Sequence, residues 1–354
     1  MARKKILFII PAQYGYHTDS YKYCELLAEK YEVYYVGLNS VKPERVSDRV
    51  NVLLKNPKEC LLWRLTLLVA ALRLHKKNRF NKIFIYSFPL CSFFLLFFPR
   101  NRMVMDIRTS FIEGKYKSKL LNKLLSIESR LFKKVSVISW GVADFLSLNK
   151  QNCCLLPLGG DGVPFCNKTM DRISLLYVGT FYDRYIEKTI EGLYLFRKKN
   201  KDIEVEYTII GMGTDEEKKK IFDAISNYKV SDIVHFVGEK RHEELIPYFK
   251  SHNIGVSYIP LTDYYDCQPP TKTFEYLLNT MVVLATPTSE NRKVIDDTNG
   301  ILLLGDSPDD FAVGMEKLLD KVDGFDFSEI YHNAMVYSWS NIVSKYLIPI
   351  VEFE

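Results

Sequence analysis

The stretch YYDCQPPTKTFEYLLNTMVVLATP, residues 264–287, combines three local signals that predict a loop, a helix and a buried strand in succession. A polar loop ends at Pro270, a short amphipathic segment follows, and the apolar run 281–285 has the composition of a strand buried in a parallel sheet. Lys272 and Glu275 are three residues apart and so lie on one face of the first helical turn. Because helix N-termini at the edge of an open α/β sheet attract anions, we expect an anionic ligand here. The alternative is a solvated Lys/Glu pair on an ordinary surface helix.

The rest of the chain repeats this alternation of apolar strands with helices, which is typical of doubly wound parallel sheets. We expect strands over residues 6–10, 31–37, 50–54, 82–86, 102–107, 135–139, 153–157, 174–179, 205–211, 233–238, 254–259, 281–285 and 301–303. At 354 residues the chain is too long for one ordinary core. We therefore predict an α/β protein with two Rossmann-like domains, residues 1–167 and 168–354.

The composition, 47% apolar and 26% charged, is that of a soluble globular protein. A net charge of +5 suits anionic ligands or an anionic membrane face, but it is too small to indicate a nucleic-acid binder. The seven cysteines have no CxxC spacing, which indicates reduced thiols in a cytoplasmic protein. Since there is neither an Asp-x-Asp motif nor a spaced His/Cys/carboxylate cluster, we expect no metal and no cofactor.

Two segments of the predicted first domain have a composition that could allow contact with a membrane. The apolar stretch FPLCSFFLLFFP, residues 88–99, falls below the roughly 18 residues that a spanning helix needs, so we interpret it as a buried helix of the core. A basic helix is expected over residues 113–134, with seven Lys and Arg against only Glu113 and Glu128. Such a helix can lie on an anionic bilayer, although most basic helices are ordinary solvated surface elements.

The loop that follows the first strand, PAQYGYHTD at residues 11–19, contains a single glycine, Gly15. A dinucleotide-binding turn needs the GxGxxG pattern at this place, because its glycines let the backbone approach the pyrophosphate. The sequence therefore argues against an NAD-dependent enzyme.

The pattern Pro270, Lys272, Glu275 and Tyr276 before a short apolar strand resembles the nucleotide-sugar site of retaining GT-B glycosyltransferases, especially glycosyltransferase family 4. The turn LPLGGD at 156–161 and the motif Tyr-Ser-Trp at 337–339 resemble further motifs of that family, so the resemblance covers most of the chain. It implies a GT-B fold whose ligand cleft lies between an acceptor-side first domain and a nucleotide-sugar-binding second domain. A last helix, about 340–354, would cross back to the first domain.

On the donor side, the resemblance implies that Glu275 binds the ribose hydroxyls of the nucleotide. We predict that Arg184 and Lys272 neutralise the donor diphosphate, with Lys188 in reserve; the alternative for Arg184 is an ion pair with Asp183 or Glu187. The other members of the predicted donor set are Gly15, Gly179, Arg241 and Thr271. The family often carries a second glutamate eight residues before Glu275, near the transferred sugar, and here that position is Cys267.

On the acceptor side, the first loop approaches the acceptor in the family, which makes His17 a candidate by position. Asp106 and Arg108 lie at the carboxyl end of a predicted strand, where catalytic groups of open sheets gather. We predict that Asp106 orients an acceptor hydroxyl and that Arg108 meets a phosphate. The alternatives are a surface-loop histidine and an Asp/Arg pair that caps the strand.

The resemblance implies transfer of a hexose-type sugar, with retention, from a UDP- or GDP-sugar to an acceptor hydroxyl. Without a metal, cations and helix-end amides would stabilise the leaving diphosphate. We expect a glycan or lipid-linked acceptor in cell-surface polysaccharide or glycolipid assembly, and a cytoplasmic protein with peripheral contact to the inner face of the membrane. Two alternatives remain, namely a nucleotide-sugar epimerase of the same fold and a catalytically inactive GT-B module, which Cys267 favours.

Overall fold

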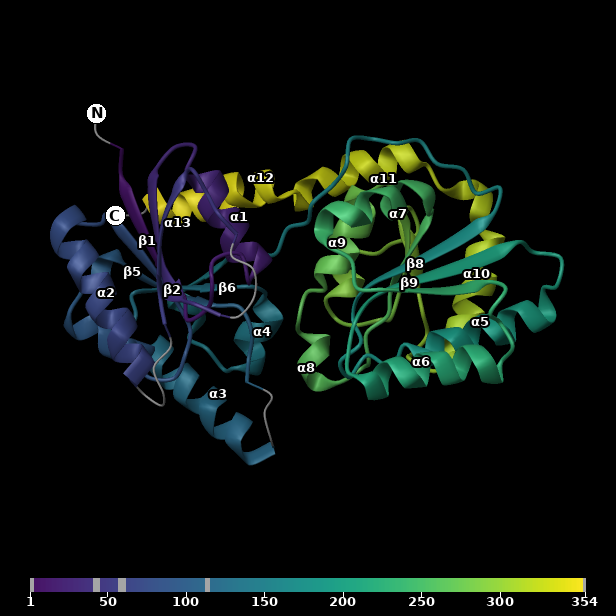
Figure 1. Ribbon diagram of the computed structural model, residues 1–354, viewed down its shortest axis with the longest axis horizontal. Coiled ribbons are helices and arrows are strands. Elements are labelled where there is room, and N and C mark those ends of the chain that lie inside the picture. Colours follow the sequence, from purple (N-terminus) through teal and green to yellow (C-terminus); the bar gives the residue numbers. More distant parts are fainter. Residues whose placement is uncertain (1–2, 41–44, 57–61, 112–114, 353–354) are drawn as a thin grey trace. The chain divides into compact units, whose positions relative to one another are not determined.

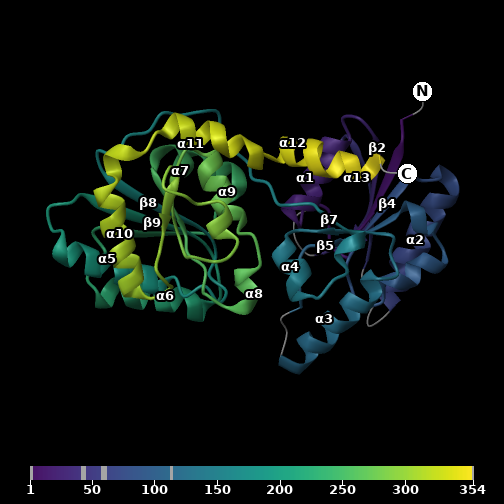
Figure 2. The same ribbon diagram turned by 180° about the vertical axis from the view of Figure 1, so that it is seen from behind.

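The computed structural model describes residues 3–40, 45–56, 62–111 and 115–352, and it divides into two compact units (Figure 1). Unit 1 comprises Met1–Leu158 and Trp339–Glu354, and unit 2 comprises Gly159–Ser338. Each unit is built on one sheet whose paired strands run parallel, with helices on both faces (Figure 2). The predicted α/β, doubly wound class is confirmed.

Among the described residues of unit 1, seven strands form one sheet in the order β3-β2-β1-β4-β5-β6-β7. Their bounds are β1 Lys5–Ile9, β2 Glu32–Leu38, β3 Val50–Lys55, β4 Lys82–Tyr86, β5 Met103–Ile107, β6 Lys134–Val137 and β7 Cys153–Leu155. The helices are α1 Thr18–Leu27, α2 Leu62–Asn78, α3 Lys115–Ser129, α4 Trp140–Phe145, α12 Trp339–Ile342 and α13 Ile348–Glu352, with short helices η1 Cys91–Leu96, η2 Arg100–Arg102, η3 Lys150–Asn152 and η8 Val343–Leu347. The C-terminal segment, α12 to α13, packs beside α1 on one face of the sheet, and α2 and α3 cover the other (Figures 1 and 2).

In unit 2 the six strands follow the order β10-β9-β8-β11-β12-β13. Their bounds are β8 Ile173–Thr180, β9 Val205–Met212, β10 Val234–Gly238, β11 Ile254–Ser257, β12 Val282–Ala285 and β13 Gly300–Leu302. The helices are α5 Glu187–Lys199, α6 Asp215–Asn227, α7 Ile246–Ser251, α8 Asp263–Asp266, α9 Thr271–Leu278, α10 Pro308–Asp320 and α11 Phe327–Ala334, with short helices η4 His242–Leu245, η5 Asn291–Lys293, η6 Val322–Gly324 and η7 Met335–Tyr337. Capping boxes at Thr214 and Ser307 fix where α6 and α10 begin.

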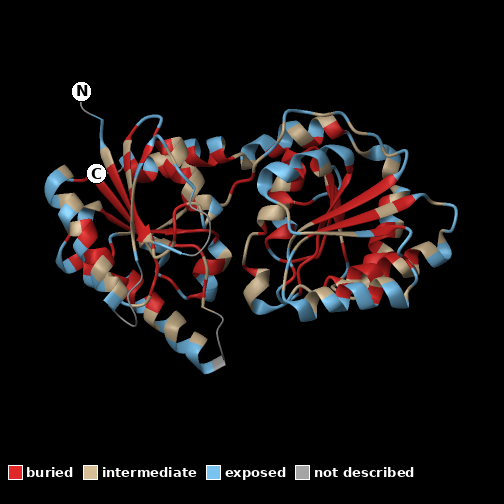
Figure 3. Ribbon diagram, in the orientation of Figure 1, coloured by how far each residue is buried: buried red, intermediate tan, exposed pale blue. Residues whose placement is uncertain are grey.

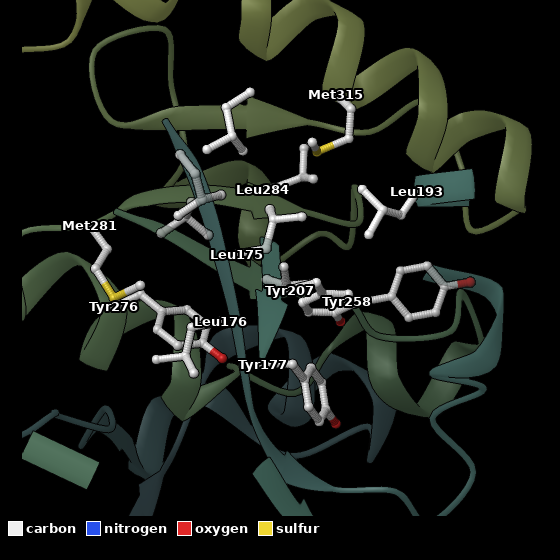
Figure 4. Packing of buried hydrophobic residues seen from close by; sticks show 14 of the residues in the cluster. Leu175, Leu176, Tyr177, Leu193, Tyr207, Tyr258, Tyr276, Met281, Leu284 and Met315 are labelled. Carbon is white, nitrogen blue, oxygen red and sulfur yellow. The ribbon is translucent and has the colours of Figure 1, made fainter. Parts of the chain in front are cut away.

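The strands form the buried centre of each unit (Figure 3). In unit 2 buried side chains of β8, β9, β12, α5 and α10 belong to one hydrophobic cluster with Tyr276 of α9 (Figure 4). Tyr276 lies directly over Gly255 of β11, where a Cβ would come within 2.1 Å of the tyrosine Cγ. Its hydroxyl oxygen accepts a hydrogen bond of 2.8 Å from the backbone N–H of Val178. These contacts hold α9 against β8 and β11, and a connection that includes α8 leads from the carboxyl end of β11 to the first residue of α9.

The structure changes three expectations. The division falls between Leu158 and Gly159 rather than at 167/168, because residues 159–168 pack on unit 2. Asn279, for example, donates through Nδ2 to the carbonyl of Asp161 at 3.0 Å and accepts at Oδ1 from the backbone N–H of Val163 at 3.1 Å. The predicted basic helix ends at Ser129 rather than 134, since Lys134 begins β6, and Glu113 lies outside the described residues.

Residues 88–98 do not form the buried α-helix that the sequence predicted. Only part of the stretch is core, and the short helix η1 leaves Leu90, Phe93, Leu96 and Phe97 exposed. A helix of six residues with about three residues per turn cannot turn every apolar side chain inward.

Candidate functional site

Lys272 occupies the first turn of α9, and its side chain reaches back across the end of β8. A Cβ on Gly179 would lie 3.1 Å from Lys272 Nζ, so glycine leaves the room that the ammonium group occupies. Nζ lies 4.0 Å from the centre of the Tyr177 ring, a cation–π contact. Although the side chain is partly exposed, Nζ itself is buried and has no hydrogen-bond partner. A buried polar nitrogen in this state is costly and indicates a site that a ligand completes.

Arg184 lies in the loop that joins β8 to α5. Its neighbours Asp183 and Tyr185 both have left-handed backbone, with φ of 46° and 51°. Non-glycine residues in this region store strain, and such strain gathers at functional sites. The guanidinium stacks on the Tyr265 ring, with Cζ 4.1 Å from the ring centre, and Nη1 is buried without a hydrogen-bond partner. The loop therefore holds a second unsatisfied cationic nitrogen.

These two cations influence each other. Burial lowers the pKa of Lys272 well below its ordinary value, the positive charge of Arg184 lowers it further, and Glu275 partly offsets both effects. A multiply charged anion would satisfy both nitrogens and remove their repulsion. The sequence predicted that Arg184 and Lys272 act together, and the structure places them in one electrostatic environment at the end of β8.

The start of α9 adds backbone donors. Its N-cap residue is Pro270, and no side chain caps the helix, in contrast to α6 and α10. The first N–H groups of a helix have no partner within the helix and carry the positive end of its dipole. Thr271 is the first residue of α9 and is half-buried, as is Glu275 one turn later. The arrangement suits an anion that contacts the helix terminus as well as the two cations.

The other predicted donor residues have contacts of their own. Lys188 Nζ donates to the carbonyl of Asp306 at 3.3 Å. Arg241 is an exposed residue of an ion pair, with Nε 3.3 Å from Glu244 Oε2. Gly15 belongs to unit 1 and has φ of 81°, and a Cβ there would come within 2.6 Å of Arg45 Cδ. The positive φ and the close approach of Arg45 explain why this position is a glycine.

The predicted acceptor-side residues form a buried polar cluster in unit 1. Arg108 is only 4% exposed, and its guanidinium donates to Asp19 Oδ2 at 2.8 Å, to the Tyr23 hydroxyl at 2.9 Å and to the Leu156 carbonyl at 2.7 Å. These bonds tie β5, α1 and β7 together. The structure thus gives Arg108 a part in the fold, and its predicted contact with a phosphate stays a prediction.

Asp106 lies beside this arginine. Its Oδ1 accepts a hydrogen bond of 2.7 Å from Ser136 Oγ and lies 3.7 Å from Arg108 Nη1. Burial raises the pKa of Asp106 to about 6, although Arg108 and Ser136 both oppose the shift. His17 is the N-cap residue of α1, and its ring stacks on Tyr86 with centres 5.2 Å apart. Burial lowers the pKa of His17, which favours the neutral imidazole that a general base requires.

Cys267 is buried at the end of α8. Its Sγ lies 3.2 Å from the carbonyl oxygen of Tyr264, and burial raises the pKa of the thiol to about 11. A neutral thiol cannot supply the charge of the glutamate that the family often carries at this position. Asp266 and Glu290 are the nearest acids to the thiol, but each has a partner of its own, Ser289 and Lys293 respectively.

Tyr177 and Tyr265 are the functional candidates that sequence reasoning missed. Both place an aromatic face beneath a cation of the site. Tyr177 precedes Gly179 by two residues, so strand alternation puts the two on the same side of β8, and that signal was available. No comparable signal indicates Tyr265, because its contact joins two separate loops.

Residues 172–321 match the model of the family described as glycosyl transferases group 1. The match covers most of unit 2. The matched residues include Gly179, Arg184, Lys272 and Glu275, so the whole cation site lies within the group 1 region. A search of curated proteins finds no match.

Solved structures extend the likeness to the entire chain. A glycosyltransferase from Rickettsia africae has a TM-score of 0.76 at 12% identity, over 99% of this chain and 98% of that one. HepE from Anabaena, in complex with UDP and glucose, has a TM-score of 0.72 at 12% identity, over 99% and 100%. The lipopolysaccharide outer core galactosyltransferase WaaB has a TM-score of 0.70 at 13% identity, over 98% and 99%. At such identities the likeness shows the fold, which is GT-B.

Proposed function

We propose that the protein is a glycosyltransferase that moves a sugar from a nucleoside diphosphate sugar to an acceptor hydroxyl. The observation that carries this proposal is the pair of buried, unpartnered cationic nitrogens, Lys272 Nζ and Arg184 Nη1, within the group 1 region. A diphosphate is a ligand whose several charges match two cations and an uncapped helix terminus at once.

The chemistry of the site follows from where negative charge develops. When the bond from the anomeric carbon to the diphosphate breaks, the leaving group gains charge, and Lys272 and Arg184 stabilise it more strongly than the bound donor. Glu275 binds the ribose hydroxyls, and Asp106 and His17 serve the acceptor, with retention of anomeric configuration. Of the two predicted donor nucleotides we favour UDP, because the proteins of similar structure include HepE, which was solved in complex with UDP-glucose.

We also propose the class of acceptor and the cellular process in which the protein acts. Two proteins of similar structure are the lipopolysaccharide outer core galactosyltransferase WaaB and WaaG, a glycosyltransferase involved in lipopolysaccharide biosynthesis. This similarity supports a glycan or lipid-linked acceptor in cell-surface assembly. No described helix has the length and apolar character needed to cross a bilayer. Among the described residues no group of three or more His, Cys, Asp and Glu could hold a metal ion, and metal independence stays a prediction.

The test is to incubate the protein with UDP-glucose, UDP-galactose and GDP-mannose, with and without a panel of sugar and glycolipid acceptors, and to measure released UDP or GDP. Release that depends on an acceptor, with a product of unchanged anomeric configuration by NMR, supports the proposal. A new nucleotide sugar formed without any acceptor identifies an epimerase instead. Nucleotide binding without turnover on any acceptor identifies an inactive module.

A further inference from the structure

An apolar hollow of about 570 Å³ opens on the surface of unit 1 where α2 meets η1. The α2 side contributes Leu62, Leu65 and Leu68, the η1 side contributes residues 92–96, and Leu131 closes one end. Leu65 is 50% exposed and Leu96 is 71% exposed. Exposed leucine and phenylalanine side chains gathered around one hollow mark an interaction surface rather than ordinary surface scatter. We call this surface the apolar hollow.

The hollow is held in shape by buried polar contacts. The carboxylate of Glu128, at the end of α3, accepts hydrogen bonds of 2.9 Å from the backbone N–H groups of Leu90 and Ser92. Leu90 itself has left-handed backbone, with φ of 70°. While Phe88, Phe94 and other members of the stretch anchor η1 in the core, the same turn presents Phe93 and Leu96 outward. The exposed side chains are therefore fixed by the fold.

The residues that line the hollow include two cations and no acid. Residues 60–105 contain eight Lys and Arg and no Asp or Glu. Arg64 and Arg100 line the hollow itself. Glu128, the only acid of α3, is 3% exposed and turned toward η1, so it contributes little negative charge at the surface. Apolar side chains beside cations match an anionic lipid surface, because the acyl chains can contact the apolar side chains and the phosphates can bind the cations.

We infer that the apolar hollow docks this protein on an anionic bilayer. Leucine and phenylalanine side chains enter the boundary between headgroups and acyl chains, and arginines meet the lipid phosphates. A second copy of the chain is a poorer occupant, because a twofold contact would bring the same acid-free basic segment against itself. The inference goes beyond the proposed function and does not depend on it. It also moves the expected membrane contact from α3 to the α2–η1 surface.

The test is co-sedimentation of the full chain with vesicles of phosphatidylcholine alone and of phosphatidylcholine mixed with phosphatidylglycerol, at low and high salt. The variant Leu65→Glu/Leu96→Glu alters the hollow, and Phe222→Glu/Leu304→Glu is the matched control, since both of its positions are exposed apolar residues of unit 2. We expect salt-sensitive binding to the anionic vesicles, at least about tenfold weaker in the hollow variant and unchanged in the control. Circular dichroism and thermal midpoints verify that each variant is folded, and Leu96→Ser replaces the double variant if it unfolds.

Absence of wild-type binding at low salt would overturn the inference, as would equal binding of the wild type and the hollow variant. Binding that is lost in Lys117→Glu/Lys119→Glu/Lys123→Glu but kept in the hollow variant would assign the membrane contact to α3 instead. Self-association that the hollow variant abolishes, without any vesicle binding, would identify a subunit interface and overturn it as well.

Discussion

Replacing Lys272 with methionine removes the ammonium group while keeping an unbranched side chain over Tyr177. In the free protein Lys272 Nζ is buried, has no hydrogen-bond partner and is repelled by Arg184. An orphaned buried polar group costs about 1 to 3 kcal/mol. We therefore expect Lys272→Met to stabilise the ligand-free protein, with a rise in thermal midpoint of about 2 to 4 °C for each kcal/mol recovered.

The same substitution should weaken ligand binding. A charge-assisted hydrogen bond contributes about 1.5 to 3 kcal/mol, so the affinity for UDP should fall about 10- to 150-fold while the affinity for uridine is unchanged. Isothermal titration calorimetry measures both. Lys199→Met is the matched control, because Lys199 Nζ forms an exposed ion pair with Glu316 at 3.0 Å. Unchanged UDP affinity, or a lower thermal midpoint, would refute the assignment of Lys272 to the diphosphate.

The lowered pKa of Lys272 adds a pH signature to this prediction. Above its lowered pKa the free protein holds a neutral Lys272, whereas a bound diphosphate favours the charged form, so binding takes up a proton. The UDP affinity should therefore fall as pH rises from that lowered pKa toward the ordinary lysine value of about 10.4. Calorimetry in buffers of different ionisation enthalpy measures the proton uptake, which Lys272→Met should abolish. Identical heats in all buffers would show that Lys272 is already charged in the free protein.

Three further substitutions test other parts of the account. Glu275→Ala should weaken the binding of uridine and of UDP by the same free energy, about 1 to 3 kcal/mol, whereas the surface control Glu316→Ala should change neither. A loss of affinity confined to UDP would contradict the ribose role. Gly179→Ala should weaken UDP binding, because its Cβ would lie 3.1 Å from Lys272 Nζ, whereas Gly324→Ala meets no atom within 4 Å and should leave calorimetric affinity unchanged. For Asp106, burial raises the pKa from 3.8 to about 6, so this carboxyl stabilises the folded state most at low pH and loses that contribution as pH rises from about 4 to about 6. The thermal midpoint of Asp106→Asn relative to wild type should rise across that window, and a constant difference would show that Asp106 titrates normally.

Local periodicity predicted most of the fold, since buried parallel strands such as β1 and β12 are continuous apolar runs in the sequence. It failed at residues 88–98, where apolar composition alone cannot tell a buried helix from a short turn with one exposed side. That distinction depends on Glu128, which is distant in the chain and fixes Leu90 and Ser92. Tertiary contacts of this kind leave no local pattern.

The site shows the same limit. Lys272 and Glu275 became candidates because both lie on one turn of one predicted helix, and Arg184 because it follows a strand predicted to end on glycine; their roles in binding the donor stay predictions. The three hydrogen bonds that Arg108 donates, by contrast, go to Asp19 and Tyr23 of α1 and to Leu156 after β7. All three partners are distant in the sequence, so the sequence alone could not show that these donors are already engaged. The charge and position of an arginine in the sequence can indicate a functional role, but only the packing around it shows whether its donors are free to bind a ligand.

A crystal structure of the protein with UDP tests the central claim most directly. We predict oxygen atoms of the diphosphate within hydrogen-bond distance of both Lys272 Nζ and Arg184 Nη1, with the ribose hydroxyls at Glu275. Density for the nucleotide elsewhere, or a complex in which these two nitrogens still lack partners, would contradict the account.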